Sequence, residues 1–338
     1  MTNNKNRLAI DGGQPVRTIP LPPWPVFSES EITAAADILR SGKVNYWTGN
    51  QGELFEQEFA SSVGCRYGVA VANGTVALEL ALYAAGIGPG DEVIVPCRTF
   101  IATASAVVMR GARPVFADID PVSQNITQDT VGPHITEKTK AIIAVHLAGW
   151  PCDMVPLAKL AGDHKLLLIE DCAQAHGSSY NSKPVGSLGD VAAFSFCQDK
   201  IMTTGGEGGM LVTNNHHIWE RAWSFKDHGK SLAARNQRNT TAHFRWLHDE
   251  FGTNWRLTEI QATIGRRQLR QLTDWVNTRR RNALFLNQQF SAVQALRTTI
   301  PADNEYHAYY KYYIFLKPEA LLPSWNRDHI LEAVNAEG

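Results

Sequence analysis

An aspartate and a lysine, each placed at the end of an apolar run, have the chemistry needed to hold and activate a bound ring. Asp171 ends the apolar run Leu166–Asp171, and Lys200 comes shortly after the run Val191–Phe196. Open α/β sheets bind their ligands at the carboxyl ends of their strands. A carboxylate there can pair with a protonated ring nitrogen, and a lysine withdrawn from water offers a nucleophilic amine for a Schiff base. Taken alone, Asp171 is equally compatible with a helix cap or a metal ligand, and Lys200 with a surface loop.

A third segment offers a site for a phosphate group. Asn73-Gly74-Thr75 follows the apolar run Tyr67–Val71 and opens a predicted helix. Free backbone amides at a helix N-terminus bind anions, although Thr75 is equally well explained as a plain N-cap. The glycines of Gly205–Gly209 let the backbone pass close to a bound ring, and they match no nucleotide-binding fingerprint. Together the three segments supply a phosphate site, a carboxylate and an amine, the groups that pyridoxal 5'-phosphate requires.

The elements that must position these residues follow from the apolar pattern between Ser28 and Val212. Ser28 and Glu31 form a capping box that opens the first helix, and Gly42 ends it. Further helices are predicted at Glu53–Val63, Thr75–Ala85, Thr99–Arg110 and Met154–Asp163, and strands at Tyr67–Val71, Glu92–Pro96, Pro114–Asp118, Ala141–His146, Leu166–Asp171, Val191–Phe196 and Met210–Thr213. Strands that are apolar throughout and separated by helices indicate a sheet buried on both faces. The predicted fold class is α/β, with a mostly parallel central sheet sandwiched by helices.

The character of the chain changes from Leu257 onward. A long amphipathic helical stretch runs toward Gln294, and an aromatic strand is predicted at Tyr309–Leu316. We therefore expect a large domain over residues 1–265, with an N-terminal arm at residues 1–27. Residues 266–338 are expected to form a smaller α+β C-terminal domain.

The composition excludes several classes of protein. The 338 residues are 44% hydrophobic and 19% charged, as in an ordinary globular protein. A balance of 32 Lys and Arg against 33 Asp and Glu lacks the basic excess of a nucleic-acid-binding protein. No segment has the length and hydrophobicity of a signal peptide or a membrane span, so we expect a cytoplasmic protein without membrane partners.

No metal site is expected. The five cysteines are widely spaced and form no C-x-x-C pair, so they are predicted to be buried thiols. The segment that starts at Asp118 resembles a calcium loop, but Ser123 stands where that loop needs glycine and Asp129 where it needs glutamate.

Several motifs, in the same order and at the same spacing, resemble the DegT/StrS family of sugar aminotransferases, within the fold type I group of pyridoxal-phosphate enzymes. The resemblance extends from about Leu8 to the last residue. Its motifs are Asn73-Gly74-Thr75, Pro96-Cys97-Arg98-Thr99-Phe100, Glu170-Asp171-Cys172-Ala173-Gln174-Ala175-His176-Gly177, Phe194-Ser195-Phe196, Gly205–Gly209, Thr253-Asn254-Trp255-Arg256-Leu257-Thr258-Glu259 and Gln261-Ala262.

The resemblance implies roles for individual residues. Lys200 resembles the lysine that holds pyridoxal 5'-phosphate and carries a proton between substrate and cofactor, and Asp171 resembles the partner of the pyridine nitrogen. Gln174 resembles the group beside the phenolic oxygen of the cofactor, and Phe100 the aromatic side chain that stacks on its ring. The residues that resemble phosphate ligands are Gly74, Thr75, Ser195 and Asn254, the last of them donated by the second subunit of a homodimer with shared active sites. His176 and His228 are candidates for the substrate side, although a structural histidine explains each of them equally well.

The implied reaction moves an amino group from an amino acid, glutamate or glutamine, to a keto sugar. The sugar is expected to be nucleotide-linked, and the biosynthesis of amino sugars, surface polysaccharides or antibiotics is the expected setting, with keto-cyclitols left open. A branch of the family with histidine at the position of Lys200 performs dehydration, so the lysine favours transamination. Two alternatives remain, a pyridoxal-phosphate-dependent sugar dehydratase or isomerase and a non-catalytic regulatory subunit. Because family members usually continue for some tens of residues, the C-terminal domain is expected to be incomplete.

Overall fold

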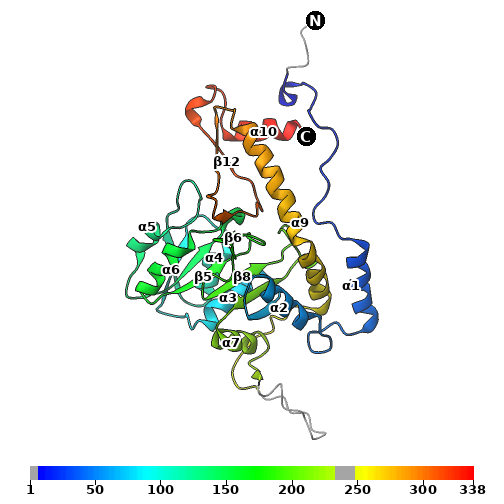
Figure 1. Cartoon of the computed structure of the whole chain (residues 1–338), viewed down its shortest axis with the longest axis vertical. Coiled ribbons are helices and arrows are strands. Elements are labelled where there is room, and N and C mark those ends of the chain that lie inside the picture. The colour runs from blue at the N-terminus through cyan, green and yellow to red at the C-terminus, as the bar shows by residue number, and fades with distance from the viewer. Residues whose placement is uncertain (1–6, 233–247) are drawn as a thin grey trace. The chain divides into compact units, whose positions relative to one another are not determined.

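The computed structural model describes residues 7–232 and 248–338. Its centre is a seven-stranded sheet with the strand order β1-β9-β8-β5-β4-β2-β3 (Figure 1). The strands are β1 (Tyr67–Val71), β2 (Glu92–Pro96), β3 (Arg113–Ala117), β4 (Thr139–Val145), β5 (Leu167–Asp171), β8 (Val191–Ser195) and β9 (Gly209–Thr213). Strand β9 runs antiparallel to both of its neighbours, and the other neighbouring strands are parallel. The predicted fold class is confirmed.

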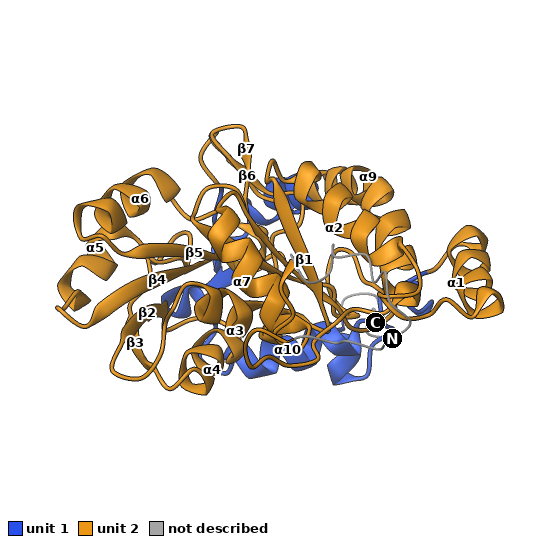
Figure 2. Ribbon diagram, turned by 90° about the horizontal axis from the view of Figure 1, so that it is seen from below, with its two compact units in different colours: residues 1–26, 282–300, 313–338 blue, residues 27–281, 301–312 orange. Residues whose placement is uncertain are grey.

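Both faces of this sheet are buried, because successive side chains of a strand point to opposite sides. On one face Val69, Ile143 and Ile169 pack with helices α3 (Gly74–Ala84), α4 (Ala102–Met109) and α7 (His216–Lys226). On the other face, alternate residues such as Ala70, Phe194 and Met210 pack with α2 (Gln51–Ser62) and the first part of α9 (Glu259–Phe290). Figure 2 shows these helices on the two sides of the sheet. Most positions of the inner strands are therefore apolar, whereas the edge strand β3 is partly exposed and begins with Arg113.

Helix α1 (Glu29–Ser41) begins and ends as its sequence predicts. The Ser28 hydroxyl accepts from the Glu31 amide, and the Glu31 carboxylate accepts in return from the Ser28 amide at 2.7 Å. Gly42 follows with a φ of 68°, the left-handed conformation that favours glycine at a helix C-terminus. The predicted capping box is confirmed.

Helix α2 is capped by a residue that lies far away in the sequence. Its N-cap residue, Asn50, makes no side-chain cap. The buried Glu259 carboxylate instead accepts from the amides of Gln51 at 2.6 Å and Gly52 at 2.9 Å. Glu259 thereby joins the start of α9 to the start of α2 with two charge-assisted hydrogen bonds.

Two predicted elements differ from the structure. Helix α4 begins at Ala102, three residues later than expected, because the preceding residues form the turn after β2. The predicted strand Tyr309–Leu316 is wrong over most of its length, and only β12 (Ile314–Leu316) is a strand. The backbone of Tyr309 has a φ of 51°, which a strand cannot contain, and long-range hydrogen bonds hold its neighbours in place.

The chain forms two compact units (Figure 2). One comprises residues 27–281 and 301–312 and contains the central sheet, with α5 (Gln128–Val131), α6 (Met154–Asp163) and the short strands β6 (Ser179–Tyr180), β7 (Lys183–Pro184) and β11 (Glu305–Tyr306). The other comprises residues 1–26, 282–300 and 313–338, and it contains β10 (Leu296–Thr298), β12 and α10 (Arg327–Ala336). The expected domain boundary near residue 266 stays a prediction. None of the described helices combines the length and the apolar composition that crossing a bilayer demands.

The cap on α2 predicts a stability effect. Substitution of Glu259→Gln removes the negative charge and replaces one acceptor with a donor that faces a backbone amide. We expect the free energy of unfolding, measured by urea titration, to fall by about 2 kcal/mol. Glu29→Gln, an exposed change in the first turn of α1, is the control and is expected to cost much less. Equal stability of the two variants would show that the long-range cap contributes nothing.

Candidate active site

The carboxylate of Asp171 is held at the end of β5 by two donors. The Thr103 hydroxyl donates to one oxygen at 2.8 Å, and the Ala173 amide donates to the other at 3.1 Å. Burial raises the pKa of Asp171, while these two hydrogen bonds and the charge of Lys200 act in the opposite direction. The sequence argument missed Thr103, which comes from α4, and nothing in its local pattern indicates a partner 68 residues away.

Lys200 lies in the loop that follows β8. Its side chain is 14% exposed, and its Nζ lies 3.8 Å from the Asp199 carboxylate. The same Nζ lies above the ring of Tyr310, 4.9 Å from the centroid. The lysine is largely withdrawn from water, as expected, and a carboxylate and an aromatic face lie beside its amine.

The start of α3 lies against the ends of β8 and β9. A Cβ added to Gly74 would lie 2.5 Å from the Cβ of Ser195, and one added to Gly209 would lie 2.3 Å from the carbonyl oxygen of Asn73. Both positions therefore require glycine. Asn73 caps the helix by accepting from the Val76 amide at 3.0 Å, so the alternative in which Thr75 is the N-cap is wrong. Thr75 is exposed in the first turn of this helix, close to the buried Ser195.

Gln174 lies in the turn after β5 and braces an unusual backbone conformation. Its side-chain oxygen accepts from the amide of Ala148 at 2.7 Å. Ala148 has a φ of 58°, which is strained for a residue other than glycine. The hydrogen bond fixes the side-chain oxygen of Gln174, and the amide group can turn its nitrogen toward a ligand.

Phe100 and Asn254 are both exposed in the chain. Phe100 is 67% exposed and lies two residues before the start of α4, and its carbonyl accepts from the amide of Thr103. The backbone of Asn254 forms an isolated bridge with Asp227, and its neighbour Trp255 accepts from the amide of Ala72 at 2.9 Å. Asn254 thus lies in a segment fixed beside the turn between β1 and α3, with its side chain accessible.

The two candidate histidines have different surroundings. His176 is 1% exposed and packs against the rings of Phe194 and Phe196. Burial lowers the pKa of His176 to about 3, with a further contribution from the charge of Lys200, so this ring is neutral at pH 7. His228 is exposed in the loop after α7, and its carbonyl accepts from the ring of His248 at 2.6 Å. The structural role that we left open for His176 agrees with this environment.

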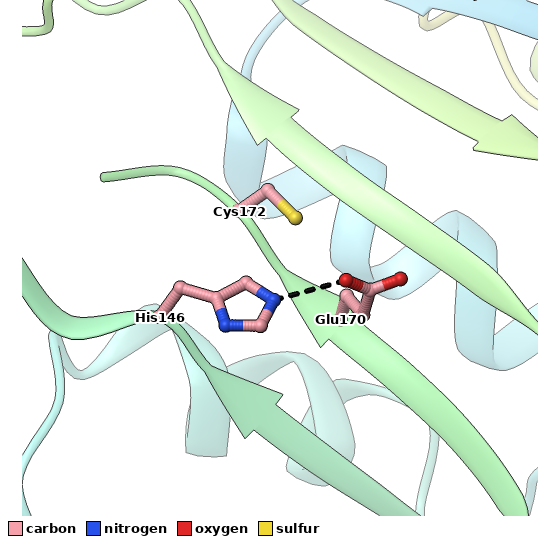
Figure 3. A group of neighbouring side chains, drawn as sticks. All are labelled: His146, Glu170 and Cys172. Carbon is pink, nitrogen blue, oxygen red and sulfur yellow. Dashed lines mark hydrogen bonds and ion pairs between the residues drawn. The ribbon is translucent and has the colours of Figure 1, made fainter. Parts of the chain in front are cut away.

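A buried cluster beside Asp171 contains a histidine, a glutamate and a cysteine, the residue types that bind metals (Figure 3). The Nε2 of His146 lies 3.0 Å from Glu170, and its Nδ1 accepts from the Cys152 amide, so Nε2 carries the proton and donates. Glu170 also accepts from three backbone amides of residues 186–189. Both ring nitrogens and both carboxylate oxygens are already used, so this cluster is a hydrogen-bonded brace rather than a metal centre.

The expected phosphate, ring and amine sites converge at one edge of the sheet. Strands β1, β5 and β8 run in the same direction, so Val71, Asp171 and Ser195 end at that edge. The structure thus brings together Gly74, Thr75, Phe100, Asp171, Gln174, Ser195 and Lys200 around the carboxyl ends of these strands. Their roles toward a cofactor stay predictions.

The neutral state of His176 predicts a pH effect on stability. The folded-state pKa of about 3 lies below the usual 6.5, so between these values the unfolded chain binds a proton that the folded chain excludes. The contribution of the neutral His176 ring to the free energy of unfolding is therefore lost as the pH falls from 6.5 toward 3. The free energy of unfolding is plotted against pH, and we expect His176→Phe to reduce the slope of this plot between pH 5 and pH 6 by up to about 1.4 kcal/mol per pH unit.

His164→Gln, a change at an exposed histidine, is the control for this measurement and is expected to leave the slope unchanged. A slope identical in wild type and His176→Phe would show that His176 titrates normally in the folded protein.

Known proteins resemble this chain over most of its length. GDP-perosamine synthase of Escherichia coli O157:H7 is 45% identical over 69% of the chain, and the matched part is 61% of that protein. The L-glutamine:2-deoxy-scyllo-inosose aminotransferase of Streptomyces kanamyceticus is 36% identical over 100% of the chain and 80% of its own length. The X-ray structure of an aminotransferase from Psychrobacter cryohalolentis superimposes with a TM-score of 0.90 at 48% identity, covering 94% of this chain and 82% of that one.

The resemblance that the motifs indicated is confirmed over residues 25–338. The names of these relatives contain a nucleotide sugar in one case and a cyclitol ketone with an amino donor in the other, in agreement with the expected class of function. The chain belongs to the DegT/DnrJ/EryC1/StrS aminotransferase family.

Proposed function

We propose that this protein is a pyridoxal-phosphate-dependent aminotransferase that transfers an amino group from glutamate or glutamine to a nucleotide-linked keto sugar. The observation that carries the proposal is the convergence of the Lys200 amine and the buried Asp171 carboxylate beside the N-terminus of α3. The named activities of the relatives support the substrate class. We further propose that the enzyme works in the cytoplasm, where amino-acid donors and nucleotide sugars are found.

The residues at the sheet edge fit pyridoxal 5'-phosphate. The N-terminus of α3, an eleven-residue helix, offers free amides and a positive dipole end to the phosphate. Gly74 leaves no Cβ between this helix and Ser195, so both the amides and the Ser195 hydroxyl can reach one phosphate group. Thr75 adds a hydroxyl from the first turn of the helix, and Asn254 adds an amide from a second subunit.

When bound, the cofactor supplies an electron sink for the bonds of the substrate carbon. Asp171 holds a proton on the pyridine nitrogen, and its donors Thr103 and Ala173 keep the carboxylate aimed at that position. Gln174 hydrogen-bonds the phenolic oxygen, and the exposed face of Phe100 stacks on the ring. The amine of Lys200 holds the cofactor at rest and then carries a proton to and from the substrate carbon.

The alternatives differ from this proposal in the half-reaction with the amino donor. A dehydratase or isomerase acts on the same sugars without accepting an amino group from glutamate, and a regulatory subunit does not turn over. Lys200, Asp171 and Gln174 are all present and placed at one sheet edge, which favours catalysis over regulation. The spectral change of the cofactor on addition of glutamate therefore separates the three functions.

Lys200→Ala is expected to abolish turnover and the covalent attachment of the cofactor while leaving the fold intact, because no other amine takes its place. In the wild type, borohydride reduction followed by peptide mapping is expected to locate the cofactor on Lys200, and glutamate is expected to convert the cofactor to its amine form. A cofactor adduct on any other lysine would contradict the assignment of Lys200 as the lysine that binds the cofactor.

A mixed dimer tests whether the active sites are shared. Lys200→Ala and Asn254→Ala subunits, each impaired alone, are combined into heterodimers. If Asn254 contributes to the active site of the neighbouring subunit, one site of the heterodimer carries both substitutions and the other site carries neither. The activity of the heterodimer is then about half that of the wild type. If Asn254 serves its own subunit, each site carries one lesion and mixing rescues nothing. The second result would overturn the shared site without affecting the aminotransferase assignment.

A further inference from the structure

The segment 307–312 approaches Lys200 from a distant part of the sequence. It belongs to the compact unit that contains the central sheet (Figure 2). The hydroxyl of Tyr310 donates a hydrogen bond to the Asp199 carboxylate, and the Tyr310 ring lies beneath the Nζ of Lys200 at 4.9 Å. Tyr310 is 8% exposed, whereas the side chain of Asp199 is 57% exposed, so the contact has one buried partner and one partner that reaches water. Neither Asp199 nor Tyr310 has a role in the function proposed above.

Contacts that do not involve Lys200 fix the position of Tyr310. The amide of Ala308 donates to the carbonyl of Gly149 at 3.0 Å. A guanidinium nitrogen of Arg279 donates to the carbonyl of Tyr310 at 3.3 Å. Tyr309 adopts a left-handed backbone conformation between these two contacts. These contacts hold Tyr310 in one position, and Asp199 and Lys200 lie against it there.

Several titratable groups lie around the amine of Lys200. Asp199 lies at 3.8 Å, and the pKa of its carboxyl is lowered because the hydrogen bond from Tyr310 and the charge of Lys200 outweigh its burial. Asp171 adds a second negative charge nearby, and His176 is neutral at pH 7. Lys311 contributes a positive charge 5.3 Å from the Tyr310 ring and acts in the opposite direction.

We propose that Asp199 and Tyr310 are positioning residues for Lys200: the Tyr310 hydroxyl orients the Asp199 carboxylate, and the ring and the carboxylate together hold the protonated amine at the cofactor site. The inference rests on the proposed role of Lys200. The lysine is free of the cofactor whenever the substrate has taken its place, and once it has accepted the proton from the substrate carbon it must stay close until it returns that proton. A fixed carboxylate and a fixed aromatic face limit its rotation in that state.

The test measures the reactivity of the free amine. The full chain, prepared without cofactor, is treated with acetic anhydride at pH 8, and the modification rate of each lysine is followed by peptide mass spectrometry. We expect Asp199→Asn to raise the rate at Lys200 about three- to tenfold, because loss of the carboxylate releases the amine from its contact with Asp199 and leaves it freer to meet the reagent. Asp199→Glu is expected to restore a rate near that of the wild type. Tyr310→Phe, which keeps the ring and loses the hydroxyl, is expected to give an intermediate rate.

Two controls report on charge and on folding. Asp163→Asn removes a carboxylate that pairs with Lys159 on an exposed helix, and it is expected to leave the rate at Lys200 unchanged. Lys226 is fully buried against Glu56, so its rate rises only when the structure opens. A rate at Lys200 that is unchanged in Asp199→Asn, or that rises only in step with Lys226, would overturn the proposal.

The cofactor-loaded enzyme provides a second, independent readout. Tyr310→Phe is expected to lower kcat of the glutamate half-reaction severalfold with little change in KM, because the lysine acts after the donor binds. Tyr306→Phe is the matched control, since Tyr306 donates to Asn277 and its ring is contacted by Arg280 instead. An increase in KM alone would contradict a positioning role. If the labelling responds as expected but no adduct forms on Lys200, the proposed function fails and the contact stands.

Discussion

The buried carboxylate of Glu170 is the constraint on which the rest of the site depends. It accepts from three backbone amides of residues 186–189 and from the ring of His146, so the end of β5 cannot shift along its neighbours. Adjacent residues of a strand point to opposite faces, and a slip of one residue would exchange them. Because Glu170 is fixed on one face, Asp171 is delivered to the other face at the edge where the strands end.

The remaining parts of the site come from distant segments and are fixed by contacts outside the site. Thr103 reaches Asp171 from α4, and the Asn254 segment is tied to the end of β1 by the hydrogen bond between Ala72 and Trp255. Glu259, five residues after Asn254, caps α2. A few long-range hydrogen bonds thus fix the short loops that form the proposed site.

The central sheet could be predicted from the sequence because its inner strands are buried on both faces and therefore mostly apolar. The ends of β1 and β5, and hence the positions of Asp171 and the phosphate segment, follow from this pattern alone. Thr103 and the conformation of residues 307–312 could not be predicted in this way. Both are determined by partners far away in the sequence, and an aromatic segment that packs against a loop has the same composition as a strand.

The surroundings of Lys200 combine two opposing demands. In the proposed function, the amine must leave its resting place to attack a carbonyl. Once it has accepted a proton, it must stay close to the substrate carbon, and Asp199 and the Tyr310 ring are the groups that lie beside it. Asp199 is adjacent to the lysine in the chain, whereas Tyr310 belongs to a segment that is fixed by other contacts. The position of the amine therefore depends on how firmly that segment is held beside the sheet.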